Sequence, residues 1–211
     1  MPKVSEEYRQ TRHLQILEAA TRCFAHNGFH RTSMEDIIRE SGLSPGAIYC
    51  YFSSKSDMVA EIARERHARE SALLAKLAGS PSLAEGLSQL ARAFLVILQD
   101  PKERERRKLA IQVWAESLRD KRMRNIVERG LKQRVVLAKY LGKAKRSGQL
   151  HPEVDVDSLS RVLLALLQGL ILQQAWEPDL NVEGYFSTAG SLIENVLQVK
   201  ARPRHGRKRS S

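Results

Sequence analysis

The chain has 211 residues, of which 42% are hydrophobic and 28% are charged, with a formal net charge of +11. This length accommodates one large or two small domains with a substantial core. Two cysteines, Cys23 and Cys50, provide neither a disulfide framework nor the spacing of a metal site. The polar N-terminus has no signal-peptide pattern, and the longest apolar run, 162–172, is too short to span a bilayer. We therefore predict a cytoplasmic protein with no membrane partner.

The positive charge is spread along the chain. Residues 1–70 contain ten Lys/Arg and ten Asp/Glu, a net of zero, whereas residues 71–199 contain nineteen and fourteen, a net of +5. Residues 200–209 add six positive charges and no acid. The basic character alone therefore does not identify a nucleic-acid partner. The composition of 200–211 predicts a disordered basic tail that adds only non-specific affinity for phosphates.

Helical periodicity runs through the chain and strand signals are nearly absent, which predicts an all-α fold of about nine helices. We expect them at residues 10–27, 33–41, 44–51, 55–78, 82–99, 102–118, 121–147, 156–176 and 182–199. On the first helix, Cys23 shares an apolar stripe with Ala20 and Phe24, which favours a buried thiol.

Residues 33–52 have the outline of a helix-turn-helix motif. Thr32 and Glu35 have the spacing of a capping box at the start of the first motif helix. Ser41-Gly42 ends that helix, because glycine adopts the left-handed conformation that a sharp turn requires. Ser44-Pro45 then provides a cap and a proline at the first position of the second helix, where a missing N–H costs nothing.

The second motif helix points Leu43, Ile48 and Phe52 inward and leaves Pro45, Gly46, Ala47, Tyr49 and Cys50 facing outward. The N-terminal part of such a helix is the part that enters the major groove of double-stranded DNA. Lys55 opens the next helix, where the helix dipole disfavours a cation, so a nearby phosphate would explain it. The alternative is an ordinary tight helix pair, because the motif is degenerate and Ile38 occupies a position where a small residue is usual.

Residues 48–57, Ile-Tyr-Cys-Tyr-Phe-Ser-Ser-Lys-Ser-Asp, resemble the signature of the tetracycline-repressor (TetR/AcrR) family of bacterial regulators. The upstream segments Arg12–Ala20 through Phe24, Asn27-Gly28-Phe29 and Thr32-Ser33 resemble that family as well. The resemblance covers roughly residues 10–70, and beyond them it is one of layout more than of motif.

This resemblance implies an N-terminal three-helix helix-turn-helix domain, followed by a C-terminal helical bundle. We place the DNA-binding domain at 10–70, with its recognition motif at 33–52. Residues 71–199 would form the regulatory, ligand-binding and dimerisation domain, and 200–211 the basic tail.

By resemblance, Ser33, Ser44, Pro45, Ala47 and Tyr49 would touch DNA. The complete candidate set, which includes phosphate contacts from Tyr49, Tyr51 and Lys55, is Thr32, Ser33, Ser44, Pro45, Gly46, Ala47, Tyr49, Cys50, Tyr51 and Lys55. Two positions depart from the family pattern, which often has threonine at 47 and lysine or arginine at 45. Ala47 offers only a methyl group, and Pro45 cannot donate to a base. We therefore expect phosphate contacts and DNA shape to carry more of the specificity.

The helix at 156–176 is apolar around most of its circumference and must therefore be covered on more than one side. The last helix, 182–199, also carries more than one apolar stripe. We predict that these two helices form a four-helix interface with a second copy, in the positions that the family uses for dimerisation. The alternative is an internal core in a monomer.

The helices of 82–176 carry inward-facing aromatic and polar residues, namely Phe94, Trp114, Tyr140, Gln168, Gln173 and Trp176. These residues could line an apolar cavity for a small-molecule effector, although a plain core is the alternative. Glu116, beside Trp114, is either a pocket acid for a cationic effector or, more commonly, the salt-bridge partner of a nearby arginine.

No glycine-rich phosphate loop, nucleophile elbow or catalytic carboxylate pair occurs in the sequence. His26 and His30 are separated by the helix-breaking Asn27-Gly28, so they do not share a face as zinc ligands would. We predict a protein that is not an enzyme and that uses no cofactor or metal.

The sequence as a whole predicts a DNA-binding transcriptional regulator. We expect a ligand-responsive repressor that binds a palindromic operator as a homodimer. The alternative is a helical ligand-binding or scaffold dimer with weak or lost sequence-specific DNA binding, which Pro45 and Ala47 keep open.

Overall fold

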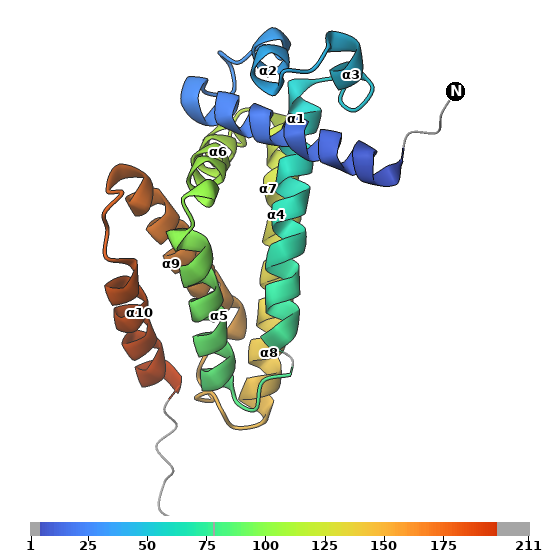
Figure 1. The fold of residues 1–211 in the computed structure, drawn as a ribbon. Coiled ribbons are helices and arrows are strands. Elements are labelled where there is room, and N and C mark those ends of the chain that lie inside the picture. Colours follow the sequence, from blue (N-terminus) through green and yellow to red (C-terminus); the bar gives the residue numbers. More distant parts are fainter. Residues whose placement is uncertain (1–4, 78, 198–211) are drawn as a thin grey trace, which may run out of the picture.

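The computed structural model describes residues 5–77 and 79–197, and this part of the chain forms ten helices joined by short loops (Figure 1). The helices are α1 (Glu6–Asn27), α2 (Met34–Ser41), α3 (Pro45–Tyr49), α4 (Lys55–Leu77), α5 (Leu83–Gln99), α6 (Lys102–Glu116), α7 (Lys121–Leu131), α8 (Gln133–Arg146), α9 (Val156–Trp176) and α10 (Val182–Leu197). Helices α1 to α3 lie across one end of the molecule, and α4 runs from there into the helical body (Figure 1).

The first hydrophobic core joins the N-terminal helices to α6 and α7. Its buried members include Ile16, Phe24, Ile37, Ile48, Met58, Leu109, Val113, Met123 and Ile126. Burial of each such side chain contributes roughly 1.5–3 kcal/mol, so this packing holds α1 to α3 firmly on the body. The N-terminal domain is therefore not an independent module on a flexible linker.

A second core lies at the far end of the body. It is built from Leu74 and Leu77 of α4 together with Leu83, Leu137, Leu141, Leu150 and Leu159. A third, smaller cluster joins Leu98, Leu170 and Val182 near the loops that precede α6 and α10. Helix α4 is the element that supplies buried residues to both large cores.

The predicted all-α fold is confirmed, and most helix boundaries fall within a few residues of the expected ones. The recognition helix α3 is shorter than expected, because it ends at Tyr49 with Cys50 as its C-cap. The predicted single helix 121–147 is two helices, which was an error. Lys132 interrupts it, with helical φ and ψ but with its N–H bonded to the Arg129 carbonyl three residues back.

Gly130 lies beside this interruption and against α4. A Cβ atom built on Gly130 would lie only 2.5 Å from Nε2 of His67 on α4. Burial of the His67 ring lowers its pKa to about 4, with a smaller contribution from neighbouring Arg66, so the ring is neutral at pH 7. The absence of a side chain at 130 thus allows α7 to approach a neutral, half-buried histidine on α4.

Helices α9 and α10 leave large apolar side chains in solvent. Val162, Trp176 and Leu192 are 53%, 71% and 61% exposed, respectively. By length and composition α9 could cross a membrane, so the apolar part of this helix extends beyond residues 162–172. In its 18-residue apolar segment, 11% of the residues are buried. A surface of this kind is expected where a second copy packs. The predicted basic tail, 200–211, lies outside the described residues.

We predict that Gly130→Ala destabilises the protein, because the new methyl group must displace His67 or separate α7 from α4. Overpacking of this kind costs about 1–3 kcal/mol, which corresponds to a fall in Tm of several degrees by calorimetry. Gly142→Ala on α8 is the matched control, since its Cβ would meet only the Arg146 guanidinium at 3.5 Å. Equal melting temperatures for the two variants would contradict the close approach of α7 to α4.

Candidate functional site

The first motif helix, α2, begins with a capping box formed by Ser33 and Asp36. The Asp36 backbone N–H donates to Ser33 Oγ at 3.1 Å, and the Ser33 backbone N–H donates to Asp36 Oδ2 at 2.9 Å. These bonds from Ser33 hold the pKa of Asp36 below its ordinary value. The capping box predicted at Thr32 and Glu35 was wrong, because the box lies one residue later. The spacing of both pairs is the same, and Ser33 is the residue with an extended backbone at the helix start.

The turn between α2 and α3 forms as the sequence predicts. Gly42 has φ +68° and ψ 14°, the left-handed conformation that favours glycine. Ser44 caps α3, because its Oγ accepts the Ala47 N–H at 3.3 Å, and Pro45 is the first helical residue. The two helices therefore have the local geometry of a helix-turn-helix motif.

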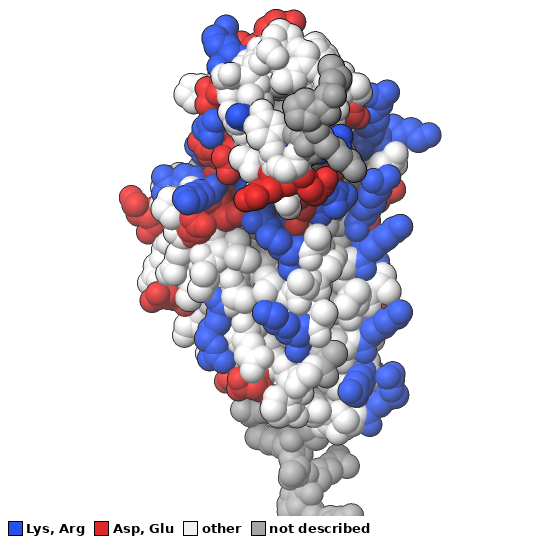
Figure 2. All heavy atoms as spheres, turned by 45° about the vertical axis from the view of Figure 1, so that its right-hand side comes forward, with Lys and Arg blue, Asp and Glu red and all other residues white. Residues whose placement is uncertain are grey.

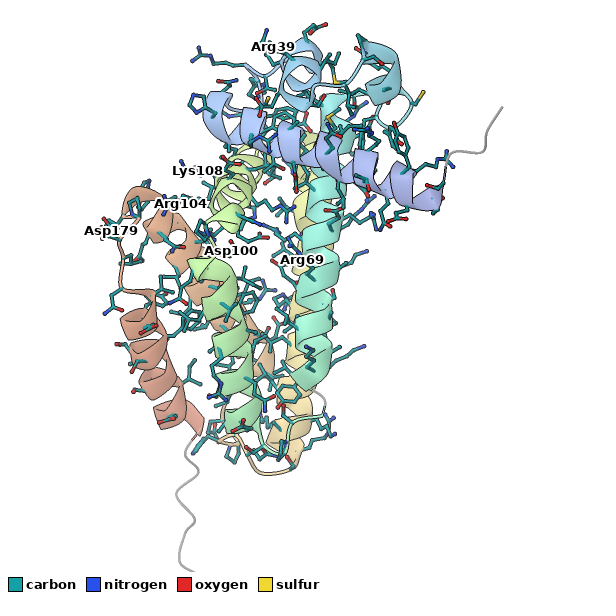
Figure 3. The ribbon with its side chains drawn as sticks, viewed as in Figure 1. Arg39, Arg69, Asp100, Arg104, Lys108 and Asp179 are labelled. Atoms are coloured by element: carbon teal, nitrogen blue, oxygen red, sulfur yellow. The ribbon has the colours of Figure 1, made fainter. Side chains whose placement is uncertain are left out.

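The outward face of α3 is confirmed as exposed. Ile48 is fully buried, whereas Tyr49 is 51% exposed. The exposed residues along this segment are Ser44, Pro45, Gly46, Tyr49 and Cys50, with Ala47 half-buried among them. Arg39 on α2 also points into solvent at this end of the molecule (Figure 3) and pairs with Asp36. The face can thus offer a phenol, a thiol, small side chains and a nearby guanidinium to a large partner.

Thr32 does not belong to this face. Its side chain is buried, with 1% of its surface exposed, and its hydroxyl donates to the carbonyls of Gly28 at 2.8 Å and Cys23 at 3.1 Å. The Thr32 side chain is therefore removed from the exposed face, and a DNA contact by Thr32 stays a prediction. Thr32 instead closes the chain reversal between α1 and α2. Ser33 is half-buried at the start of α2 and remains accessible in part.

Lys55 is held by the protein itself. Its ammonium group donates to the carbonyls of Phe29 at 2.8 Å, His30 at 3.2 Å and Thr32 at 2.9 Å. It also lies 4.7 Å from the centroid of the Phe29 ring. Three carbonyl dipoles and an aromatic face therefore explain a lysine in the first turn of α4, where the sequence analysis invoked a phosphate. A phosphate contact through Lys55 stays a prediction and would compete with these bonds.

Tyr51, just beyond α3, is half-buried against α1. Its ring centroid lies 6.3 Å from that of His13, and the Phe52 ring lies 5.2 Å from the same histidine. His13 Nε2 in turn lies 3.4 Å from Glu61 Oε1 of α4. Glu65 completes a group whose ligand-type atoms lie within 4.8 Å of one another, but Glu61 is also bound by Arg64. We interpret this group as a polar contact that positions α1 and the end of the motif on α4.

A cavity of about 290 Å³ lies in the body between α4, α5, α8, α9 and α10. Most of its lining is aliphatic or aromatic, as in sites for small organic ligands. The polar and charged residues that reach it are Glu70, Ser88, Gln133, Arg134, Tyr185 and Glu194. Because Glu70 lies on α4, the cavity wall and the N-terminal domain share one continuous helix.

Of the six residues predicted to bind a ligand, Phe94 lines this cavity. Trp114 lies beside a second, much smaller cavity of about 30 Å³ between α4, α6 and α7. Tyr140 packs near the start of α5, with its hydroxyl 3.4 Å from the Ser82 carbonyl. Gln168 is half-buried outside the cavity lining, and Gln173 and Trp176 are exposed on α9. The cavity is also lined by residues that were not predicted from the sequence and that come from three different helices, namely Glu70, Arg134, Tyr185 and Phe186.

Glu116 has a hydrogen-bonding partner on the N-terminal domain, and that partner is a histidine. Its Oε2 lies 2.8 Å from Nε2 of His30, which follows α1. The expected arginine partner of Glu116 is therefore replaced by His30, and Glu116 does not line the 290 Å³ cavity. The Gln112 side chain accepts the Phe29 backbone N–H at 3.2 Å and donates to the Phe24 carbonyl at 3.1 Å. Helix α6 thus binds the end of α1 through polar contacts as well as through the first core.

Comparisons with known proteins match both halves of the chain. Residues 16–62 match the model of bacterial regulatory proteins of the tetR family, and residues 83–198 match the C-terminal region of BetI-type transcriptional repressors. The regulator TtgR of Pseudomonas putida is 29% identical, with 84% of this chain and 86% of TtgR covered. Salmonella enterica GusR has a similar structure, with a TM-score of 0.76, 25% identity, and 92% of this chain and 98% of GusR covered. A regulator from Saccharomonospora viridis, solved with choline, has a TM-score of 0.71 and 26% identity, with 90% of this chain and 99% of that regulator covered.

We predict that Lys55→Met lowers the Tm of the full-length protein, because it leaves three carbonyls without their charged donor. Hydrogen bonds to charged groups contribute about 1.5–3 kcal/mol each, so a loss of several degrees is expected in thermal unfolding followed by circular dichroism. Lys76→Met, in the last turn of the same helix, is the control. An unchanged Tm for Lys55→Met would show that the three bonds contribute nothing to stability.

Proposed function

The chain belongs to the TetR family of bacterial transcriptional regulators, and we propose that it represses transcription by binding a palindromic operator as a homodimer. It is a ligand-responsive DNA-binding protein with an all-α fold. The single observation that carries the proposal is the exposed face of α3, held by a left-handed Gly42 and a Ser44 cap. We further propose that it acts in the cytoplasm, where an operator is accessible.

The contacts that α3 offers to DNA favour positioning over base reading. Tyr49 is exposed and can donate its hydroxyl to a phosphate, and the Ala47 methyl can pack against a thymine methyl. Pro45 has no donor for a base edge. We propose that Ser33, Ser44, Gly46 and Cys50 approach the DNA beside these residues, with Tyr51 closer to the α1 surface. Sequence preference would then depend strongly on the shape and deformability of the operator.

Dimerisation supplies the second recognition helix. The exposed apolar side chains of α9 and α10 form the surface that we propose as the four-helix interface. Two recognition helices read successive major grooves of B-DNA when they lie about 34–36 Å apart. The palindrome of the operator would then reflect the two-fold symmetry of the dimer.

The charged side chains on the surface of the body are compatible with DNA binding by a dimer. Figure 2 shows Lys and Arg side chains spread down the body, with acidic side chains gathered beneath the N-terminal domain. The last turn of α8 carries three basic residues, Lys143, Lys145 and Arg146. Such charges raise non-specific attraction to phosphates without adding base contacts.

We propose residues 10–70 and 71–199 as the two domains, although the first core crosses this boundary through α6 and α7.

The effector is proposed to bind the 290 Å³ cavity and to act on DNA binding through α4. Glu70 and Leu74 line the cavity, and Met58 and Val59 of the same helix pack in the first core. A ligand that stabilises a different tilt of α4 would change the spacing of the two recognition helices. Each 1.4 kcal/mol of differential affinity between the two states changes operator affinity about tenfold. The choline complex of the Saccharomonospora viridis regulator supports a small-molecule effector.

The alternative is a ligand-binding or scaffold dimer with weak or lost sequence-specific DNA binding. Pro45 and Ala47 favour it, since neither side chain can donate to a base. Titration of the wild-type dimer with the DNA upstream of its own gene separates the two functions. Absence of binding at low salt to that fragment and to any other genomic fragment would contradict the function of a DNA-binding regulator and support that of a ligand-binding or scaffold dimer.

We predict that Leu192→Arg converts the dimer to a monomer and weakens operator binding by at least about tenfold, because one half-site then binds alone. Sedimentation velocity and fluorescence anisotropy with operator DNA measure the two effects. Val96→Arg is the matched control, because Val96 is 69% exposed but lies on α5, outside the proposed interface. A Leu192→Arg protein that stays dimeric would rule out an interface through the exposed face of α10.

A further inference from the structure

The cavity in the body contains a carboxylate whose charge is poorly compensated. Glu70 projects from α4 into a predominantly apolar lining, and burial raises its pKa above the ordinary value. Its ion-pair partner, Arg66 of the same helix, has its Nε atom 3.5 Å from Glu70 Oε1, which is long for a charge-assisted bond. The Arg66 Nε atom is itself buried without a hydrogen-bond partner. The pair is therefore loosely formed.

The basic residue next to Glu70 in the sequence, Arg69, is paired with another acidic residue. Arg69, one residue before Glu70 on α4 (Figure 3), forms an ion pair with Glu103 of α6 at 2.9 Å. Glu103 also binds Arg106. The Glu103 carboxylate lies close enough to Glu70 to raise the pKa of Glu70 further. The Gln133 side chain donates to the His67 carbonyl at 2.8 Å and also hydrogen-bonds to Glu70. Thus the contacts around Glu70 leave room for an additional positive charge from a ligand.

The basic residue in the cavity wall is not free to receive an anion. Among the described residues that line the cavity, Arg134 is the one with a basic side chain, and it binds Asp157 at the start of α9. An anionic ligand would have to displace this carboxylate from Arg134 while remaining close to Glu70. Glu194 of α10 places a second acid at the cavity. The electrostatic balance of the lining therefore favours a cation over an anion.

Aromatic side chains add a second feature that suits a cation. Phe94 of α5 and the consecutive Tyr185 and Phe186 of α10 all line the cavity. Tyr185 is fixed by a bond from its hydroxyl to the Leu166 carbonyl at 2.8 Å, and its ring lies edge-to-face with Phe186. The negative faces of such rings attract organic cations, including those that cannot donate hydrogen bonds. A carboxylate and aromatic rings around an aliphatic cavity match a charged head attached to an apolar body.

We infer that the cavity binds a monovalent amphipathic organic cation, whose charged head pairs with Glu70 and whose apolar part fills the space between α5, α9 and α10. This inference rests on the proposed effector function and specifies the chemical class of the effector. Because Glu70 is on α4, the cation would bind directly to the helix that supports the N-terminal domain. Its arrival would also draw Glu70 away from its long contact with Arg66, on the side of α4 that faces α7 and α8.

Three probes with the same alkyl chain test the inference: octyltrimethylammonium, octan-1-ol and octanoate. Each is titrated into the full-length dimer, with binding followed by calorimetry and thermal shift below the micellar concentration. We expect the cation to bind at least about tenfold more tightly than the alcohol, with octanoate weakest. Equal affinities for the cation and the alcohol, or tighter binding of octanoate, would overturn the inference.

The residue-specific test is Glu70→Gln, which keeps the shape and removes the charge. It should reduce the affinity for octyltrimethylammonium at least about tenfold and leave the affinity for octan-1-ol nearly unchanged. Glu105→Gln, on the exposed surface of α6 and outside the cavity lining, is the control and should behave as wild type. Circular dichroism confirms that each variant is folded. Retention of the full cation preference by folded Glu70→Gln would contradict the role of this carboxylate.

Operator titration with the same probes separates this inference from the proposed function. If the cation binds through Glu70 and leaves operator affinity unchanged, the ligand class is supported and the effector function fails. If octan-1-ol or octanoate releases the operator and the cation does not, the effector function is supported and the cation inference fails.

Discussion

Helix α4 belongs to both halves of the molecule and ties them together. Met58 and Val59 are buried beneath the motif helices, and Leu74 and Leu77 are buried at the far end of the body. A helix of 23 residues is about 35 Å long and is stiff on that scale. A displacement of its cavity end must therefore be accommodated at the end that carries the recognition helix, either by rotation of the N-terminal domain or by loss of packing.

The contacts around α4 differ in strength along its length, and this difference has a functional meaning. Near the motif, the Lys55 ammonium ties α4 to three carbonyls after α1, and the first core packs tightly around Met58. In the middle, His67 is neutral and in close approach to Gly130, and Arg66 and Glu70 form a long ion pair. The loosely satisfied polar groups thus lie next to the cavity, where a ligand can change them. The well-packed end transmits the change because it does not deform independently.

The sequence predicted the features that depend on local chemistry. The glycine turn, the Ser44 cap and the outward residues of α3 require only neighbours within a few positions, and the helices follow from periodicity. The errors arise where contacts with residues distant in the sequence determine the position of a side chain. Lys55 binds carbonyls 23 to 26 residues away, and the hydroxyl of Thr32 turns back to the end of α1. The rotation of each helix about its own axis depends on all its neighbours, so of the six predicted ligand residues Phe94 alone reached the 290 Å³ cavity. Glu70 was missed because a charged residue on a long charged helix gives no sign of burial.

Coupling between the cavity and the recognition helices through α4 can be measured with the native cysteines. Cys50 is exposed at the end of α3, whereas Cys23 is buried, and burial raises the pKa of its thiol. A spin label on Cys50 of the full-length dimer therefore reports the separation of the two recognition helices by pulsed electron resonance. We expect one narrow distance distribution for the free dimer, and a shifted distribution when octyltrimethylammonium is added at a concentration that saturates its thermal shift. Identical distributions with and without the saturating ligand would contradict the coupling.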